Sequence, residues 1–354
     1  MANNPLGNHV DVTVVIPTRD RYFTTLPLTI VSIAMQTVKP KHLIIYDDGA
    51  KMDLRQNATY RYIFETLDSH GIKWQVKFGE DKGQAILHDR SIKDSETEFI
   101  WRIDDDCVAE PETLATLLGV LKSDPKNGAV GGIVAEPNKL VPKPSFLNGT
   151  LDDAMLGHNI QWYASYKSVE VEHLYSSFLY RKEASSHGYR KDLSRASHRE
   201  ETIFTHQMHL NGWKLVFTPN AITWHYRNAE GGIRLSNQAE FAHDENVFNG
   251  ILMLDWKIKW QRPEIIVLDS GIGDHYAFKH ILPDLIKKHA GKRIILAVCY
   301  PGVFHDCYCP DVELTSIRDA SFVTDIHKQN VYKFMADNNW KANLVEAYKK
   351  LYQV

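Results

Sequence analysis

Residues 99–111 read Phe-Ile-Trp-Arg-Ile-Asp-Asp-Asp-Cys-Val-Ala-Glu-Pro, an apolar run that ends abruptly in three consecutive carboxylates. The apolar part is typical of a buried strand, and Pro111 then stands near the start of a helical pattern over 112–121. Three like charges at the end of a buried strand repel one another unless a counter-charge is present. A divalent cation supplies that charge, and carboxylate oxygens suit Mg²⁺ or Mn²⁺. The alternative is an acidic surface turn that holds no ligand.

Strands alternate with helices on both sides of this stretch. The strand patterns cover 10–16, 43–46, 73–78 and 99–103, and the helical patterns between them cover 26–36, 60–69 and 84–93. The alternation predicts an α/β domain with a largely parallel sheet. Polar loops follow three successive strands, at the edge where such a sheet binds ligands. A metal–nucleotide site at this edge is therefore the first functional hypothesis.

The second half of the chain continues with mixed elements. We expect strands over 129–134, 173–180, 214–218 and 221–225, and a helix over 200–210 that Gly212 terminates. A second α/β unit begins at Pro263, with strands over 265–268 and 293–298 and helices over 277–289 and 332–352. The predicted domains are residues 1–230, a helical connector over 231–262, and a smaller Rossmann-like unit over 263–354.

Composition is that of an ordinary globular protein. The 354 residues are 44% hydrophobic and 24% charged, and the formal net charge is -3, which gives no general attraction to nucleic acid or anionic membranes. The apolar runs are far too short to span a membrane, and the N-terminus lacks the features of a secretory signal. Four cysteines form no disulfide framework in a chain of this size, so we expect a cytoplasmic protein.

A set of short motifs resembles family 2 glycosyltransferases of the GT-A fold. The motifs occur in the family's order and at near-family spacing over about residues 10–227, and they are Val14-Val15-Ile16-Pro17-Thr18-Arg19, Tyr46-Asp47-Asp48-Gly49, Ile103-Asp104-Asp105-Asp106, Arg199-Glu200-Glu201 and Pro219-Asn220-Ala221-Ile222-Thr223-Trp224-His225. The resemblance implies a GT-A fold, a Rossmann-like and mostly parallel sheet that binds a nucleotide-sugar donor.

The resemblance also implies roles on the donor side. Pro17, Thr18 and Arg19 match the first loop, which surrounds the nucleoside. Asp48 matches the acid that accepts a hydrogen bond from uracil, so the expected donor is a UDP-sugar. Asp104 matches the acid near the ribose and is also counted with the metal ligands.

The metal and catalytic roles come from the same resemblance. Asp106, the last acid of the DXD motif, matches the metal ligand, and His225 matches the histidine that closes the metal and diphosphate site. Asp105 is counted with the nucleotide-binding residues. Glu201 matches the general base, with Glu200 as the alternative. Together these residues imply an inverting transferase of a hexosyl or N-acetylhexosaminyl group that uses Mn²⁺ or Mg²⁺.

One departure from the family leaves the diphosphate contact open. Many relatives carry an Arg-Asn pair in the helix before the metal strand, where this chain has His88-Asp89 followed by Arg90. Lys82 is the alternative to Arg90 for this contact.

The acceptor is the least defined partner. A basic segment directly before the expected base consists of Arg181, Lys182, Arg190, Lys191, Arg195 and Arg199. It suggests an acceptor that carries phosphate, such as a glycan, a lipid carrier or nucleic acid, although the net charge does not support nucleic acid. The alternative is a solvated loop that contacts no acceptor.

Two other functions stay open from the sequence. A metal-dependent nucleotidyl- or phosphotransferase would also use paired carboxylates. A non-catalytic nucleotide-sugar-binding module would keep the binding residues without turnover. In the C-terminal unit, residues 269–275 resemble the first loop of heptosyltransferase-like GT-B domains, and His305, Cys307 and Cys309 lack a partner pair at zinc-site spacing.

Overall fold

The computed structural model describes residues 9–78, 82–137, 149–155, 167–228, 230–233, 238–307, 309–317 and 329–354. These residues form two compact units that divide between Ile258 and Lys259, with Met155 grouped with the second. Helix α7 (Gln238–Gly250), inside the predicted connector, belongs to the first unit. The domain boundaries proposed from the sequence stay predictions.

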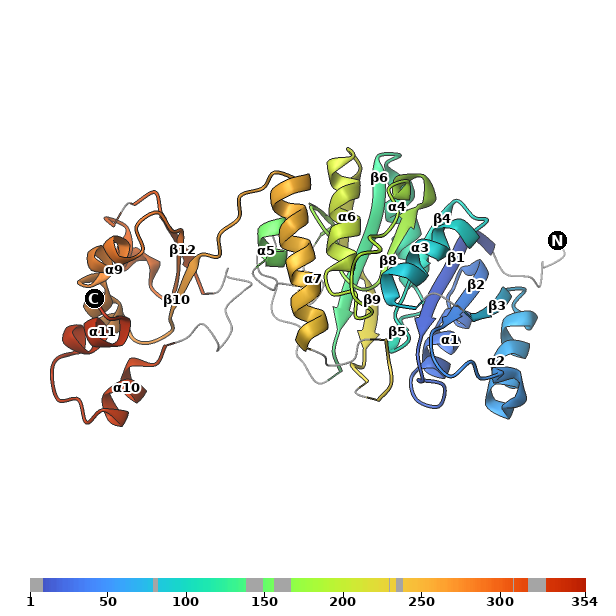
Figure 1. Ribbon diagram of the computed structural model, residues 1–354, viewed down its shortest axis with the longest axis horizontal. Helices are drawn as coiled ribbons and strands as arrows, with labels where there is room; N and C mark the ends of the chain where they lie inside the picture. Colours follow the sequence, from blue (N-terminus) through green and yellow to red (C-terminus); the bar gives the residue numbers. More distant parts are fainter. Residues whose placement is uncertain are drawn as a thin grey trace. The chain divides into compact units, whose positions relative to one another are not determined.

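The first unit alternates strands and helices, as the sequence predicts (Figure 1). Its strands are β1 (His9–Thr18), β2 (Lys39–Asp47), β3 (Lys73–Phe78), β4 (Phe99–Arg102), β5 (Cys107–Ala109), β6 (Asn127–Ala135), β7 (Val169–Val171), β8 (Phe178–Arg181) and β9 (Lys214–His225). Its other helices are α1 (Leu26–Ala34), α2 (Ala58–Ser69), α3 (Gln84–Asp94), α4 (Thr113–Ser123), α5 (Leu151–Met155) and α6 (Glu200–Leu210). The predictions for β3 and α6 match the structure at both ends.

Nine strands of the described chain join into one mixed sheet, in the order β3-β2-β1-β4-β8-β6-β9-β5, with β7 also on β9. The first four strands in this order are parallel. β8 runs antiparallel to its neighbours β4 and β6, whereas β6 and β9 are parallel. β5 is antiparallel to β9. The sheet therefore has the largely parallel architecture expected, with antiparallel strands inserted beyond β4.

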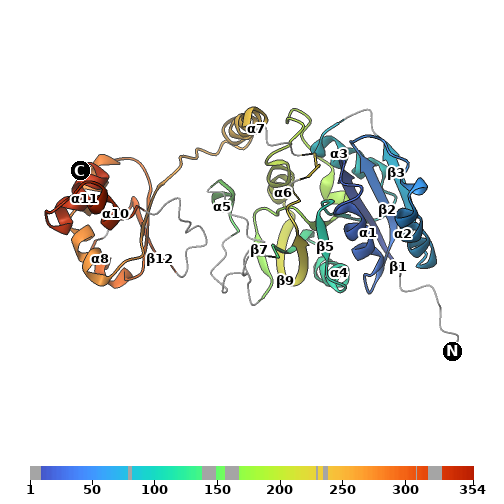
Figure 2. The ribbon, with the colours of Figure 1, turned by 90° about the horizontal axis from the view of Figure 1, so that it is seen from below.

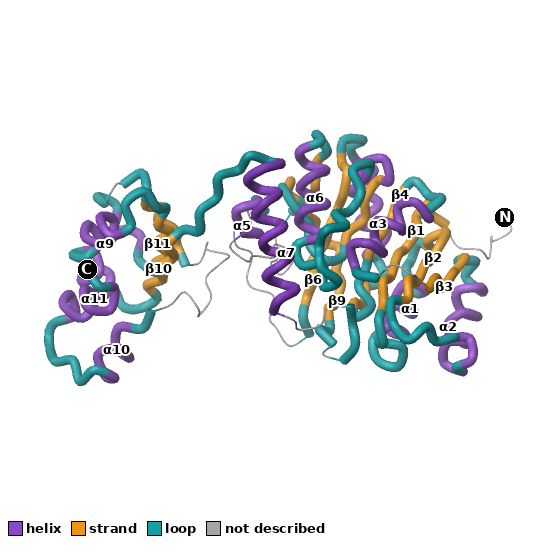
Figure 3. The backbone as a smooth tube through the Cα atoms, viewed as in Figure 1, coloured by secondary structure: helices purple, strands orange, loops and turns teal. Residues whose placement is uncertain are grey.

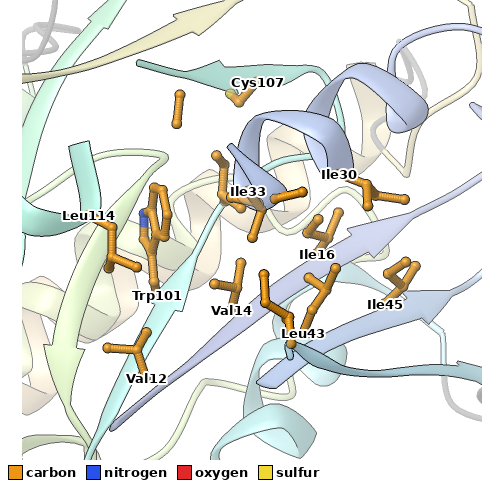
Figure 4. Close-up of a cluster of buried hydrophobic side chains, with 14 of the residues drawn as sticks. Val12, Val14, Ile16, Ile30, Ile33, Leu43, Ile45, Trp101, Cys107 and Leu114 are labelled. Carbon is orange, nitrogen blue, oxygen red and sulfur yellow. The ribbon is translucent and has the colours of Figure 1, made fainter. Parts of the chain in front are cut away.

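Helices cover both faces of this sheet (Figures 2 and 3). Alternate residues of β1, such as Val12, Val14 and Ile16, point to one face and pack with α1, α2 and α4 in the main core (Figure 4). This alternation is the two-residue period of a strand, and Trp101 of β4 extends the same layer. α3 and α6 lie on the other face, where Tyr46 of β2 donates a hydrogen bond to Asp94.

Three details differ from the sequence prediction. The expected strand over 173–180 is wrong, because β8 begins only at Phe178 and Ser176 has φ of +55°, a left-handed value that interrupts a strand. The short strand β5 was not predicted, since three residues give no periodic signal. In addition, the two strands expected over 214–225 form one strand, β9.

The second unit contains three parallel strands in the order β10-β11-β12. The strands are β10 (Glu264–Leu268), β11 (Ile294–Val298) and β12 (Val312–Ser316), and the helices are α8 (Ile272–Lys279), α9 (Leu282–Lys288), α10 (Val331–Asp337) and α11 (Leu344–Tyr352). The helix expected over 277–289 is therefore two helices, and Pro283 stands at the start of the second. A small α/β unit of this kind confirms the second fold element predicted from the sequence.

Candidate active site

The acidic triplet forms a tight turn between β4 and β5. The Cys107 N–H donates to the Asp104 carbonyl at 3.1 Å as the chain enters β5. β5 then pairs with the end of β9, where Cys107 is in register with His225. The turn is therefore held both by the central strands and by the last residues of β9.

Arg21, in the loop after β1, neutralises part of the acidic turn from within the protein. Its Nη1 lies 2.6 Å from Asp105 Oδ1 and 3.0 Å from Asp106 Oδ2. Thr18 donates a further hydrogen bond to Asp105 at 2.7 Å. Burial raises the pKa of Asp105 to about 6, although Arg21 acts in the opposite direction. Arg21 therefore supplies part of the counter-charge that the sequence-based prediction assigned to a metal ion alone.

Asp106 faces His225 across the turn. The Nε2 atom of His225 lies 3.3 Å from Asp106 Oδ1, and the Asn228 N–H donates to Asp106 Oδ2 at 3.1 Å. Burial alone would raise the pKa of Asp106, but His225, Arg21 and the Asn228 N–H together hold it below its usual value. The two residues matched to metal ligands are therefore adjacent, and the carboxylate is kept in the ionised form that binds cations.

Asp104 is the most exposed member of the triplet, with 18% of its side-chain surface accessible. Ser176 donates to one of its carboxylate oxygens at 2.9 Å, and Gln84 donates to the other at 3.3 Å. The left-handed residue that breaks the expected strand thus contributes a hydrogen bond to the acidic turn.

A cavity of about 320 Å³ opens over this turn, a size in the range of small-molecule sites. The predicted residues that line it are Pro17, Asp104, Asp105, Asp106 and His225, and the residues that the sequence argument missed are Arg21, Gln84, Tyr175, Arg227, Asn228 and Ile233. Arg21 could have been found from the sequence, because it lies in the same loop as Arg19. Arg227 and Asn228 lie two and three residues after His225. Gln84 and Tyr175 give no sequence signal.

The first loop reaches the site in different ways. Pro17 lines the cavity, whereas the Thr18 side chain is buried against Asp105. The Thr18 carbonyl also accepts from the Asp48 N–H at 2.8 Å. Arg19 has a buried Nη1 with no hydrogen-bond partner among the described residues, so it has a donor to offer a ligand.

Asp48 is buried behind the cavity rather than in its wall. The Gly83 N–H donates to Asp48 Oδ2 at 3.1 Å, and Arg195 Nη2 lies 3.1 Å from Asp48 Oδ1. Lys82 is more distant, at 3.8 Å from Asp48 Oδ1. Arg195 thus pairs with this carboxylate in the structure, and its role as the acceptor for uracil stays a prediction.

Arg90 lies apart from the cavity wall. Its guanidinium is 3.4 Å from Asp94 and stands over the ring of Tyr46 at 5.8 Å. Lys82 is absent from the cavity lining as well. The choice between Arg90 and Lys82 for a diphosphate contact stays a prediction.

Glu200 and Glu201 occupy the first turn of α6 but have different surroundings. Both oxygens of Glu200 accept from Arg102 Nη1 at 2.8 Å, in an ion pair whose side chains are 0% and 1% exposed. Glu201 is also buried, and its backbone carbonyl accepts from the Thr205 hydroxyl. Glu200 is thus committed to a structural ion pair, which favours Glu201 of the two as a base.

The basic segment does not present free positive charge. Its charged side chains face carboxylates in the pairs Arg181–Glu98, Arg190–Asp192, Arg190–Asp255, Lys191–Asp89, Arg195–Asp48 and Arg199–Glu245. Lys182 donates to the Ser95 carbonyl. These acidic partners, which sequence proximity did not show, weaken the electrostatic argument for a phosphate-binding surface, and the phosphate-bearing acceptor stays a prediction.

The metal-binding geometry is confined to the acidic turn in the part of the chain that the structure describes. Ligand atoms of Asp106, Cys107 and His225 all lie within 4.8 Å of one another. Burial raises the pKa of the Cys107 thiol well above its usual value, which disfavours a thiolate ligand. His305, Cys307 and Cys309 form no comparable group. No described helix has the length and apolar character needed to cross a membrane.

Comparison with known proteins identifies the first unit. A family model described as glycosyl transferase family 2 matches residues 13–186. No curated protein matches the sequence. The crystal structure of S. aureus TarS 1-349 with UDP-GlcNAc is similar at 15% identity and a TM-score of 0.49, covering 69% of this chain and 67% of that chain. The crystal structure of GalNAc-T7 with UDP, GalNAc and Mn²⁺ is similar at 13% identity and a TM-score of 0.48. The similarity covers 70% of this chain and 48% of that chain. At these values, the two structures carry no information on what this chain binds.

The matched residues run from β1 through the acidic turn to the end of β8 and beyond, and so contain the first loop and all three aspartates. The mixed, largely parallel sheet, with the cavity over the acidic turn, is the GT-A-type fold that the motifs imply. Residues 13–186 therefore form a glycosyl transferase family 2 domain, within an α/β unit of the GT-A type.

Proposed function

We propose that this glycosyltransferase is metal-dependent and inverting, and that it transfers a hexosyl or N-acetylhexosaminyl group from a UDP-sugar to an acceptor hydroxyl. One observation carries the proposal: Asp106 Oδ1 and His225 Nε2 lie 3.3 Å apart beside the cavity that Asp104 also lines. A carboxylate oxygen and an imidazole nitrogen are ligands that suit Mn²⁺, and Mg²⁺ is the alternative. When bound there, the ion would neutralise charge on the departing diphosphate.

The donor-side residues would orient the nucleotide. Pro17 forms cavity wall, and the unpartnered Nη1 of Arg19 is available to a nucleoside or phosphate oxygen. Asp104 is the least buried acid of the turn and would accept from ribose hydroxyls. Asp48 would accept from uracil. Ordering these groups before reaction lowers the barrier by fixing the donor in position.

Glu201 would take the proton from the acceptor hydroxyl. It lies in the first turn of a helix whose neighbour Glu200 is locked to Arg102, so the Arg102 ion pair holds the helix start in place. Arg102 Nη2 is also 3.6 Å from Asp104, so the same arginine lies next to the acidic turn. Attack by the acceptor without an enzyme nucleophile produces inversion at the anomeric carbon.

The acceptor itself stays open. A phosphate-bearing glycan, lipid carrier or nucleic acid was predicted from the basic segment, and the ion pairs of that segment do not support it. Any of these acceptors, or a neutral glycan, is compatible with a carboxylate base.

A nucleotide-sugar panel tests the proposal. The full chain is melted with UDP-glucose, UDP-galactose and their N-acetyl forms, with and without Mn²⁺, and a bound ligand raises the melting temperature. We expect at least one UDP-sugar to stabilise the protein only when Mn²⁺ is present. Product analysis with the stabilising donor should show transferred sugar of inverted configuration. An equal rise in melting temperature with and without Mn²⁺, or a product with retained configuration, would contradict the proposal.

A further inference from the structure

Arg21 uses every nitrogen of its guanidinium inside the site. Nη1 bridges Asp105 and Asp106, at 2.6 and 3.0 Å. Nη2 donates to the Asn228 carbonyl at 2.7 Å, and Nε donates to the Glu230 carbonyl at 3.3 Å. A fixed cation therefore lies among the carboxylates and is held in place by the chain that follows His225.

The backbone after β9 is shaped around this arginine. Gly232 has φ of +94°, and a Cβ at this residue would lie 2.7 Å from Arg21 Nη2. The Gly232 N–H also donates to the Arg19 carbonyl at 2.7 Å. The close packing leaves the guanidinium little freedom to leave the acidic turn.

The contacts decide which carboxylate oxygens a divalent ion can use. Both carboxylate oxygens of Asp105 already accept a hydrogen bond, one from Arg21 and the other from Thr18, so Asp105 offers a metal ion no uncommitted oxygen. Asp106 Oδ2 accepts from the Asn228 N–H and lies beside Arg21. Of the four carboxylate oxygens of Asp105 and Asp106, Asp106 Oδ1 is the one that neither Arg21 nor these hydrogen-bond donors contact. It faces His225 Nε2.

A divalent ion at Asp106 and His225 would thus have few protein ligands and a permanent positive charge nearby. Oxygen-ligated ions of this kind prefer about six ligands and commonly take several from substrate phosphates. Ligand charge count changes divalent-ion affinity by orders of magnitude. The diphosphate of a donor supplies both the missing ligands and the missing negative charge.

We infer that Arg21 is a built-in cation that shares the acidic turn with the divalent ion and keeps the ion's affinity low until a nucleotide diphosphate is bound. The inference rests on the proposed metal-dependent function and adds a residue that sets the order of binding. Arg21 is in this sense a positioning residue: it acts through Asp105 and Asp106 and makes the metal site dependent on the donor.

The test measures Mn²⁺ binding by the loss of the free-ion electron paramagnetic resonance signal, with the full chain and no turnover. The variants are Arg21→Gln, which removes the charge, and Arg21→Lys, which keeps it. Arg55→Gln is the control, because Arg55 is an exposed arginine that pairs with Asp53 on the surface. Each protein is titrated with Mn²⁺ alone and with Mn²⁺ plus UDP, and circular dichroism checks the fold.

For Mn²⁺ alone, we expect Arg21→Gln to bind at least about tenfold more tightly than the wild type, whereas Arg21→Lys and Arg55→Gln stay near the wild-type value. UDP should tighten Mn²⁺ binding to the wild type by at least about tenfold and to Arg21→Gln by much less. Equal affinities of wild type and Arg21→Gln for Mn²⁺ alone would overturn the inference.

The wild type alone also decides the matter if Arg21→Gln does not fold. Tight binding of Mn²⁺ without UDP, unchanged when UDP is added, would refute a donor-dependent site. A different result would refute the proposed function itself. If no protein binds Mn²⁺ even with UDP, Asp106 and His225 are not metal ligands. The two failures are therefore distinguishable in one set of titrations.

Discussion

Asp106 Oδ1 lies 3.3 Å from His225 Nε2, although the two residues come from distant parts of the chain. The contact follows from strand pairing, because Cys107 of β5 is in register with His225 of β9. Residues adjacent to an antiparallel pair are carried to the same end of the ladder. The sheet itself therefore sets the distance between the two candidate ligands.

Removing either candidate ligand should abolish metal-linked stabilisation. We expect Asp106→Ala and His225→Ala to lose the rise in melting temperature that Mn²⁺ and UDP give the wild type, because each removes one of two adjacent ligand atoms. Differential scanning fluorimetry measures this. Glu65→Ala, which removes an exposed carboxylate on α2, should keep the full rise. A normal Mn²⁺ response in both site variants would show that the ion binds elsewhere.

The two glutamates of α6 should respond differently to amidation. Glu201→Gln should still bind the donor but lose turnover by at least about 100-fold, the effect of removing a general base. Glu200→Gln should instead lower the free energy of unfolding by roughly 3–5 kcal/mol, because it removes the carboxylate that pairs with the buried Arg102 Nη1. Kinetics and urea unfolding of both variants give the comparison. Full turnover in Glu201→Gln would remove it from the mechanism.

The Arg102–Glu200 pair should behave as a unit in a double-mutant cycle. Arg102→Met alone removes the arginine that pairs with the buried Glu200 carboxylate and should cost about 3–5 kcal/mol of folding free energy. The double variant Arg102→Met/Glu200→Met should recover most of that loss, since apolar side chains of similar volume replace both charges. If the Arg102–Glu200 ion pair positions Glu201, the double variant should regain stability but not turnover. Simple additivity of the two single losses would show that the residues do not interact.

Asp105 should lower stability as the pH rises from about 4 to about 6. Burial raises its pKa in the folded protein to about 6, above the ordinary value of an aspartate of about 3.9, so the folded state binds more protons than the unfolded state in this interval. Stability then falls with increasing pH through the interval. Asp105→Asn removes this dependence, and its melting temperature relative to wild type should rise between pH 4 and pH 6. Parallel pH profiles for the two proteins would contradict the raised pKa.

Gly132 should tolerate no side chain. A Cβ there would overlap the Ala221 carbonyl oxygen where β6 and β9 change register. Gly132→Ala should therefore cost about 1–3 kcal/mol or more of folding free energy. Gly119→Ala is the matched control, because no atom lies within 4 Å of its Cβ position in helix α4. The control should gain roughly 0.5–1 kcal/mol, and urea unfolding of both variants checks the contrast.

Much of the fold could be predicted because its signals are local. Short runs of apolar and β-branched residues identified β1, β2 and β4, and apolar residues at helical spacing identified helices such as α2, α3 and α6. The strand expected over 173–180 failed because Ser176 adopts a left-handed conformation that a periodic pattern does not reveal. β5 was missed because its three residues acquire strand structure only by pairing with β9.

The sequence by itself determined that three carboxylates end a buried strand, that an α/β sheet surrounds them, and which motifs belong to family 2 glycosyltransferases. Periodicity and motif order are properties of neighbouring residues, so the linear chain contains them. Only the tertiary structure decided that Arg21 forms ion pairs with Asp105 and Asp106. The same holds for the ion pair of Arg102 with Glu200 and for the carboxylates that pair with the basic segment. These are charge pairings between distant residues, and their energies depend on distance and burial, which exist only once the chain has folded.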